Sequence, residues 1–194
     1  MPVSPCPHST LDARAVYVST YLGHRFFPLA PCIEDVAIED IAHGLAFQCR
    51  FNGQTTHFYS VAQHSLIVAS LVPRRLALAG LLHDAAEAYL GDLVKPLKTI
   101  FPEFSRVEAM VMGVIGERFG VSCFSDRAIK RADLVALATE KRDLMPRSNE
   151  PWSSLEGIAP LPSRIEPLPP EVARAEFLAA FQRFSAAARV RIAA

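Results

Sequence analysis

The chain has 194 residues, of which 51% are hydrophobic and 21% are charged, so it is long enough for one domain with a substantial core. Its 20 Lys and Arg residues balance 20 Asp and Glu residues, which excludes the overall basic field that holds nucleic acid by its phosphates. No apolar run approaches the roughly 20 residues that cross a bilayer, and the N-terminus lacks the pattern of a secretory signal. We therefore expect a cytoplasmic protein that binds no membrane and no nucleic acid.

Hydrophobic periodicity predicts a mostly helical protein with a small β appendage. Residues 1–15 are expected to form a loose leader, and two short β-prone runs within residues 17–31 predict a hairpin. Helical spacing of apolar residues then predicts five helices, at about residues 38–49, 60–73, 74–90, 103–119 and 126–144. Ser60 and Gln63 form a capping box at the start of the second helix.

Prolines mark the remaining segments. Pro96 and Pro102 bracket a connection between two of these helices, and seven prolines within residues 146–170 predict an irregular segment. A last helix is expected over residues 170–186. We expect all of these elements to form one helical bundle, a single domain covering residues 1–194.

Polar residues with metal-binding chemistry interrupt three of the apolar helices. These residues are His64, His83, Asp84 and Asp133. A lone histidine is more often structural than a metal ligand, but burying two imidazoles and two carboxylates together costs several kcal/mol unless something pairs with them. A divalent transition metal suits this set of donors and leaves coordination positions open for water and substrate.

The order His, His-Asp and a distant Asp resembles the HD-domain metal-dependent phosphohydrolases. The resemblance is closest to the branch of the YfbR 5′-deoxynucleotidase and the DatZ-type dATP or dNTP triphosphohydrolases, and it covers roughly residues 16–145. It rests on the segments "IEDIAHGLAFQCRFNG", "SVAQHS", "LLHDAAEAYLGDLVKPLK" and "KRAD". The resemblance implies an HD-domain helical bundle that assembles as a homo-oligomer, a dimer or a hexamer. It also implies a Zn, Co or Mn ion at the four residues, and a second ion, Mg²⁺, with a triphosphate substrate.

The resemblance further implies two acid/base groups. Glu87 follows His83 by four residues, which would place both on one helix face, and Asp92 matches a second catalytic carboxylate of the family. We expect this pair to perform general acid/base catalysis on a phosphoester.

Five further residues are candidate substrate contacts. Arg50 and Lys98 match family positions, and Phe51 stands where branch members carry Trp, a difference that leaves stacking on a base possible. Lys95 and Lys130 are local candidates for contacts with phosphate, because Lys95 lies close to Asp92 in the sequence and Lys130 precedes Asp133 by three residues.

These features predict a hydrolase whose partner is a small nucleotide. The expected reaction converts a deoxynucleoside triphosphate into deoxynucleoside and triphosphate. The alternative within the family is a 5′-deoxynucleotidase acting on monophosphates. Two alternatives of other classes stay open: a non-catalytic HD regulatory or binding module, and a di-iron oxygenase, which needs histidine ligands beyond His64 and His83.

Overall fold

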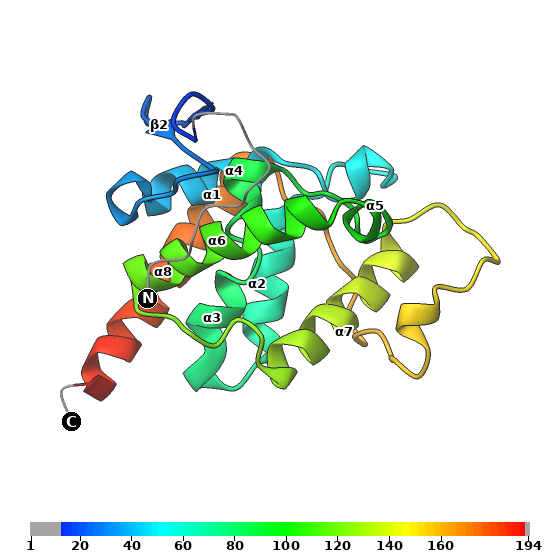
Figure 1. The fold of residues 1–194 in the computed structure, drawn as a ribbon. Coiled ribbons are helices and arrows are strands. Elements are labelled where there is room, and N and C mark those ends of the chain that lie inside the picture. Colours follow the sequence, from blue (N-terminus) through cyan, green and yellow to red (C-terminus); the bar gives the residue numbers. More distant parts are fainter. Residues whose placement is uncertain (1–12, 193–194) are drawn as a thin grey trace.

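The structure, a computed structural model, describes residues 13–192, so most of the predicted leader 1–15 lies outside the described residues. The predicted fold class is confirmed, because the chain is mostly helical with a small N-terminal hairpin (Figure 1). The helices are α1 (Ile38–Phe47), α2 (Val61–Leu71), α3 (Ala77–Leu81), α4 (Glu87–Leu90), α5 (Lys95–Ile100), α6 (Pro102–Phe119), α7 (Arg127–Asp143) and α8 (Pro170–Ile192). Within residues 13–192, no helix is both long and apolar enough to span a membrane.

The hairpin is short and packs on the helix that follows the His-Asp pair. Strand β1 (Val18–Ser19) pairs antiparallel with β2 (Arg25–Phe26), with Val18 opposite Phe26. The Phe26 side chain is fully buried and stacks on the Tyr89 ring of α4, with ring centroids 3.9 Å apart. The hairpin thus covers one side of α4.

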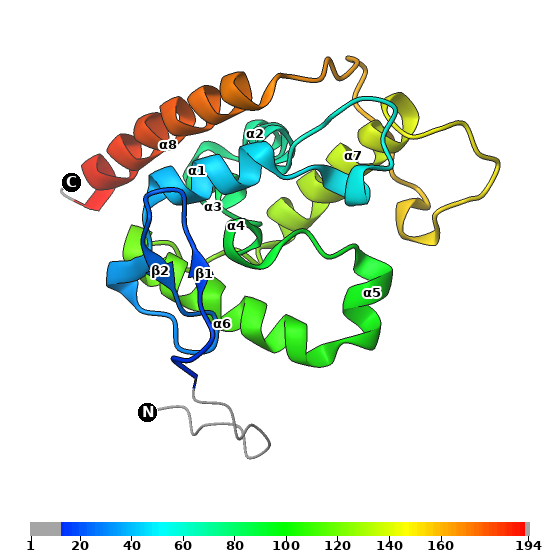
Figure 2. The same cartoon turned by 90° about the horizontal axis from the view of Figure 1, so that it is seen from above.

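The core lies between the long C-terminal helix and the first three helices. Figure 2 shows α8 lying along α1, and α8 also contacts α2 and α3. Phe177 of α8 is fully buried in this layer. The centre of the bundle is therefore closed by the last element of the chain, although α8 begins 99 positions after α2 ends, at Pro170 and Leu71.

The capping box at α2 is half confirmed. The Ser60 side chain accepts a hydrogen bond from the Gln63 backbone N–H at 3.1 Å, as predicted. The Gln63 side chain does not return to Ser60, however, because its amide bonds the backbone of Glu166 and Leu168, each at 2.8 Å. Gln63 thereby anchors the predicted irregular segment 146–170, which contains only a short 3-10 turn, Ser153–Leu155.

The predicted continuous helix 74–90 is wrong. Helix α3 ends at Leu81, residues 82–86 form a turn, and α4 begins at Glu87. Backbone bonds across the turn join residues three apart, such as Ala85 N–H to Leu82 O at 3.0 Å. Adjacent residues of an α-helix point in different directions. The break therefore lets His83 and Asp84 approach one centre.

Two further boundaries differ from the sequence prediction. The connection between Pro96 and Pro102 contains the helix α5, and each proline lies in the first turn of a helix, where the missing N–H costs nothing. Helix α8 continues to Ile192, beyond the predicted end at residue 186.

Gly44 sets the close approach of α1 to α4. A Cβ at this position would lie 2.9 Å from both the Cβ and the backbone oxygen of Ala88. We expect Gly44→Ala to lower the free energy of unfolding by about 1–3 kcal/mol, because the backbone of α4 must move. Gly113→Ala on α6 is the matched control: its new Cβ meets nothing within 4 Å, so helix propensity should stabilise it by up to about 1 kcal/mol. Urea denaturation measures both, and a Gly44→Ala protein as stable as the wild type would contradict the packing argument.

Candidate metal centre

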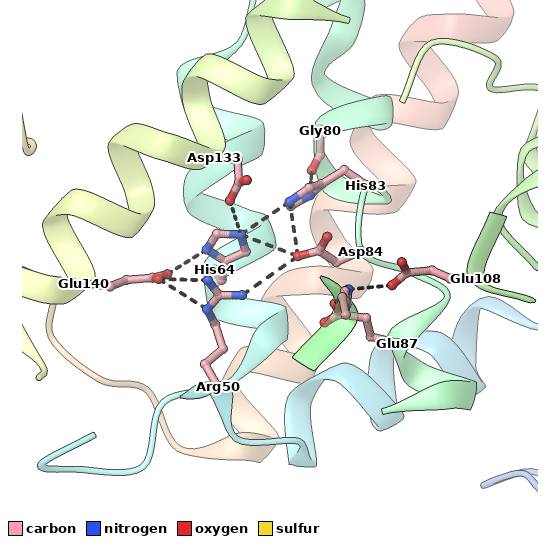
Figure 3. A network of polar contacts seen from close by, with 10 residues as sticks. Arg50, His64, Gly80, His83, Asp84, Glu87, Glu108, Asp133 and Glu140 are labelled. Carbon is pink, nitrogen blue, oxygen red and sulfur yellow. Dashed lines mark hydrogen bonds and ion pairs between the residues drawn. The ribbon is translucent and has the colours of Figure 1, made fainter. Parts of the chain in front are cut away.

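Side chains from three elements meet at one point (Figure 3). His64 comes from α2, His83 from the turn after α3, and Asp133 from α7, and their ligand atoms lie within 4.8 Å of one another. His64 Nε2 lies 3.3 Å from His83 Nε2 and 3.2 Å from Asp133 Oδ1. Asp84 joins them, with its Oδ2 3.2 Å from His83 Nε2 and 3.6 Å from His64 Nε2. We call these four residues the metal cluster.

The outer nitrogens of both imidazoles have partners that fix their tautomers. His83 Nδ1 lies 2.9 Å from Gly80 O, a carbonyl that can only accept, so Nδ1 donates. His64 Nδ1 lies 2.6 Å from Glu140 Oε1, and Arg50 and His64 hold the pKa of Glu140 at about 2 against its burial, so this carboxylate also accepts. When each ring is neutral, its proton is therefore on Nδ1, and its Nε2 presents an unprotonated lone pair to the cluster.

The metal cluster fits a divalent metal ion. Two imidazole lone pairs and two carboxylates are all acceptors, so they can be this close only around a cation or shared protons. Ligand atoms about 2.1 Å from one ion stand roughly 3–3.5 Å apart, which matches the distances between these atoms. The imidazole Nδ1–H bonds to a carboxylate and a carbonyl are the outer contacts typical of metal-bound histidine.

The electrostatics of the cluster point the same way. Burial and the Arg50 charge oppose protonation of His64, yet Glu140 and Asp133 raise its pKa to about 10. The pKa of Asp84 lies well below its ordinary value: burial opposes this shift, but the His83 and His64 imidazoles outweigh it. The carboxylates thus create a strongly negative potential that favours any bound cation.

Glu140 was missed by the sequence analysis. It is fully buried, and it accepts two hydrogen bonds from Arg50, from Nε at 3.3 Å and from Nη2 at 3.0 Å, besides the one from His64. Its position could have been found, because Glu140 follows Asp133 by seven residues and so lies on the same face of α7. Glu140 ties α7 to α2 behind the metal cluster.

Arg50, predicted to contact substrate, lies inside the protein. Arg50 is only 8% exposed, and its Nη1 atom lies 3.9 Å from Asp84 Oδ2. The next two residues, Phe51 and Asn52, have left-handed backbones with φ of 54° and 52°, a strained conformation for non-glycine residues. The Phe51 ring, with its centroid 5.1 Å from the Arg50 guanidinium carbon, also contacts Trp152 at 5.9 Å between centroids. Arg50 thus directly supports the metal cluster.

Glu87 lies beside the metal cluster. It is 4% exposed, and its Oε2 has no hydrogen-bond partner within the described part of the chain. Burial, followed by the charges of Asp84 and Asp92, raises the pKa of Glu87 well above its ordinary value. Because the turn 82–86 interrupts the helix, the predicted shared helix face with His83 is wrong, although Glu87 still borders the cluster.

The predicted partner of Glu87, Asp92, is held nearby. With the Gln48 side-chain amide flipped, the orientation that gives both of its ends a partner, its nitrogen donates to the Glu87 backbone oxygen at 2.9 Å and its oxygen accepts from the Asp92 backbone N–H. Burial raises the pKa of Asp92; the Arg50 charge opposes this shift and the Asp84 charge adds to it. Gln48 at the end of α1 therefore fixes the segment that joins both candidate acid/base groups.

The predicted phosphate contacts divide into two groups. Lys98 Nζ lies 3.1 Å from Glu87 Oε1 and 2.6 Å from Glu108 Oε1, so it adjoins the cluster but is already paired. Lys95 and Lys130 are exposed, and among residues 13–192 no ion pair joins either to the cluster. Of the three lysines, only Lys98 forms an ion pair with a candidate acid/base group within the described residues.

Comparison with known proteins shows the family of the chain. It is 39% identical over 170 residues to the uncharacterized protein YfdR of Escherichia coli, covering 87% of this chain and 96% of YfdR. It is also 39% identical over 177 residues to an uncharacterized protein of Rhodobacter capsulatus, covering 81% of this chain and 89% of that protein. No protein-family model matches the chain. The chain belongs to the family of YfdR.

Proposed function

We propose that the protein is a metal-dependent phosphohydrolase of the HD type that acts on deoxynucleotides in the cytoplasm. The observation that supports this most is the convergence of two imidazole Nε2 atoms and two carboxylates next to a buried carboxyl oxygen of Glu87 that has no hydrogen-bond partner among the described residues. His64, His83, Asp84 and Asp133 would hold the ion. A divalent metal there would supply Lewis-acid activation of water and of a phosphoryl oxygen.

The protein's own residues would then manage protons and geometry. Burial raises the pKa of Glu87 above its ordinary value, which suits this carboxyl group for giving or taking a proton. Lys98 bonds Glu87 Oε1, which leaves Oε2 as the atom for this transfer. Glu140 and Arg50 would keep the His64 ring oriented throughout.

The proposed reaction is the release of triphosphate from a deoxynucleoside triphosphate. A second candidate, 5′-deoxynucleotidase activity on monophosphates, is favoured by the pairing of Lys98 with two carboxylates, because this leaves less positive charge for a long phosphate tail. Both reactions would cut the same 5′ phosphoester with the deoxynucleoside as leaving group, and they differ in whether water receives a single phosphate or a triphosphate.

Product analysis tests the proposal and separates the two reactions. Deoxy- and ribonucleotides at each phosphorylation level are incubated with the protein loaded with Mn, Co or Zn, and the products are separated by chromatography. Deoxynucleoside with inorganic triphosphate supports the first reaction, and deoxynucleoside with orthophosphate from monophosphates alone supports the second. No turnover of any nucleotide by the metal-loaded protein would favour a non-catalytic binding module.

Glu87→Gln should separate proton transfer from metal binding. We expect turnover to fall by about 10²-fold or more while the metal content stays unchanged, because Glu87 lies outside the metal cluster. The pH–rate profile should lose the limb that Glu87 ionisation produces. Glu103→Gln, at a side chain that is 74% exposed on α6, is the control and should leave turnover unchanged. A Glu87→Gln protein without metal would make Glu87 a ligand instead.

A further inference from the structure

A groove beside α6 opens onto the metal cluster. Its volume is about 760 Å³, and its lining includes His83 and Asp84 of the cluster, one side of α6, and residues 120–125 that lead toward α7. Pockets of about 300–1,000 Å³ hold most small-molecule ligands. The groove, which we call the α6 groove, is therefore large enough for a substrate whose reacting end lies at the cluster.

The charge of the α6 groove disfavours phosphate. Glu108, Glu117 and Asp84 line it with carboxylates. Its one lysine, Lys98, is bonded to Glu87 and Glu108. A phosphate tail lying in this groove would add negative charge beside carboxylates, at an energetic cost. A neutral group with N–H and O–H donors would instead find acceptors in the same carboxylates and in the hydroxyl of Ser122.

A glycine keeps part of the groove open. Gly113 of α6 is exposed in it, and a Cβ there would meet nothing within 4 Å. Met112 and Phe124 supply apolar surface in the same lining. A sulfur atom and an aromatic ring are favourable contacts for the flat face of a base. The groove thus combines a surface for a ring with acceptors for polar groups.

We propose that the α6 groove binds the nucleoside half of the substrate, with the phosphate end directed away from it. This inference rests on the proposed function, because the metal cluster fixes where the phosphorus must lie. The sugar and the base would occupy the groove, their hydroxyl and amino groups donating to its carboxylates. Selectivity among nucleosides would then be decided at α6.

A bulky residue at position 113 tests the groove directly. In Gly113→Phe the ring fills the open space, so we expect the affinity for deoxynucleosides to fall by about tenfold or more, with unchanged affinity for inorganic tripolyphosphate. Calorimetric titration of the metal-loaded protein with each of the four deoxynucleosides, and with tripolyphosphate, measures both. Gly113→Ala should keep nucleoside binding, because a methyl group fits. Met110→Phe, at a residue 42% exposed on the same helix and outside the groove lining, controls for the added ring.

The outcomes separate this inference from the proposed function. If the wild type hydrolyses nucleotides and Gly113→Phe does so with the same KM, the groove assignment is overturned while the proposed function stands. A wild-type protein that binds deoxynucleosides in a Gly113-dependent way, yet hydrolyses no nucleotide, would retain the groove and reject the function. If Gly113→Phe loses tripolyphosphate binding, the groove binds phosphate and the proposal is overturned. If Gly113→Phe changes the oligomeric state and leaves nucleoside binding unaltered, the groove binds a second copy of the chain, which also overturns the proposal.

Discussion

Asp84→Ala should abolish metal binding and hydrolysis together. The Asp84 carboxylate lies within 3.6 Å of both cluster imidazoles, so its removal takes away a negative charge from the proposed ion. Loss of several kcal/mol of transition-state stabilisation corresponds to a fall in turnover of at least about 10³-fold. Elemental analysis of the purified protein and a nucleotidase assay measure the two effects.

The control for Asp84 is an acidic residue outside the cluster. Glu34→Ala removes an exposed carboxylate and should leave both metal content and turnover unchanged. Asp84→Asn keeps the shape of the side chain and should resemble Asp84→Ala if charge is what matters. An Asp84→Ala protein that retains one equivalent of metal and full activity would end the metallohydrolase proposal.

Glu140→Ala should have the largest effect on stability. It leaves the buried Arg50 guanidinium and the His64 Nδ1–H without their shared carboxylate. Breaking a buried ion pair by removing one partner costs about 3–5 kcal/mol, so we expect a loss of this size in the free energy of unfolding. Urea denaturation in the presence of a chelator measures it without a contribution from metal.

Glu140→Gln serves as the matched variant. Its amide oxygen can still accept from His64 Nδ1, but the charge that holds Arg50 is lost, so its stability should lie between those of Glu140→Ala and the wild type. Its metal affinity should fall by about 10–100-fold, the usual effect of changing an outer partner of a metal ligand. If Glu140→Ala unfolds at the same urea concentration as the wild type, the buried network contributes no stability.

Periodicity located five of the eight helices in the described part of the chain. Helices α1, α2, α6 and α7 lie close to the ranges that the apolar spacing predicts, and α8 starts where it was predicted, because all of them are long enough to repeat an apolar pattern. The break at residues 82–86 left no trace in the sequence: this stretch is rich in Leu and Ala and contains neither Gly nor Pro. His83 contacts His64 of α2, 19 positions earlier in the chain, and a contact between two helices leaves no periodic pattern in the sequence.

The residues of the candidate site were predicted from the sequence, but the contacts between them were not. The sequence motif placed the four residues of the metal cluster, and the structure brings them together. It could not show that Arg50 bonds Glu140, since the two lie 90 positions apart and become partners only when α7 packs on α2. For the same reason the sequence did not show that Lys98 forms ion pairs with Glu87 and Glu108.

The interrupted helix at residues 82–86 places stability and activity in opposition. Leu82, Ala85 and Ala86 are strong helix formers, although His83 and Asp84 between them are not, so a continuous helix from α3 through α4 is accessible to this stretch. Substitutions that restore such a helix would strengthen the isolated segment while turning His83 and Asp84 away from a common centre. Among descendants of this chain, variants selected for heat resistance and variants selected for turnover should therefore diverge at these five positions.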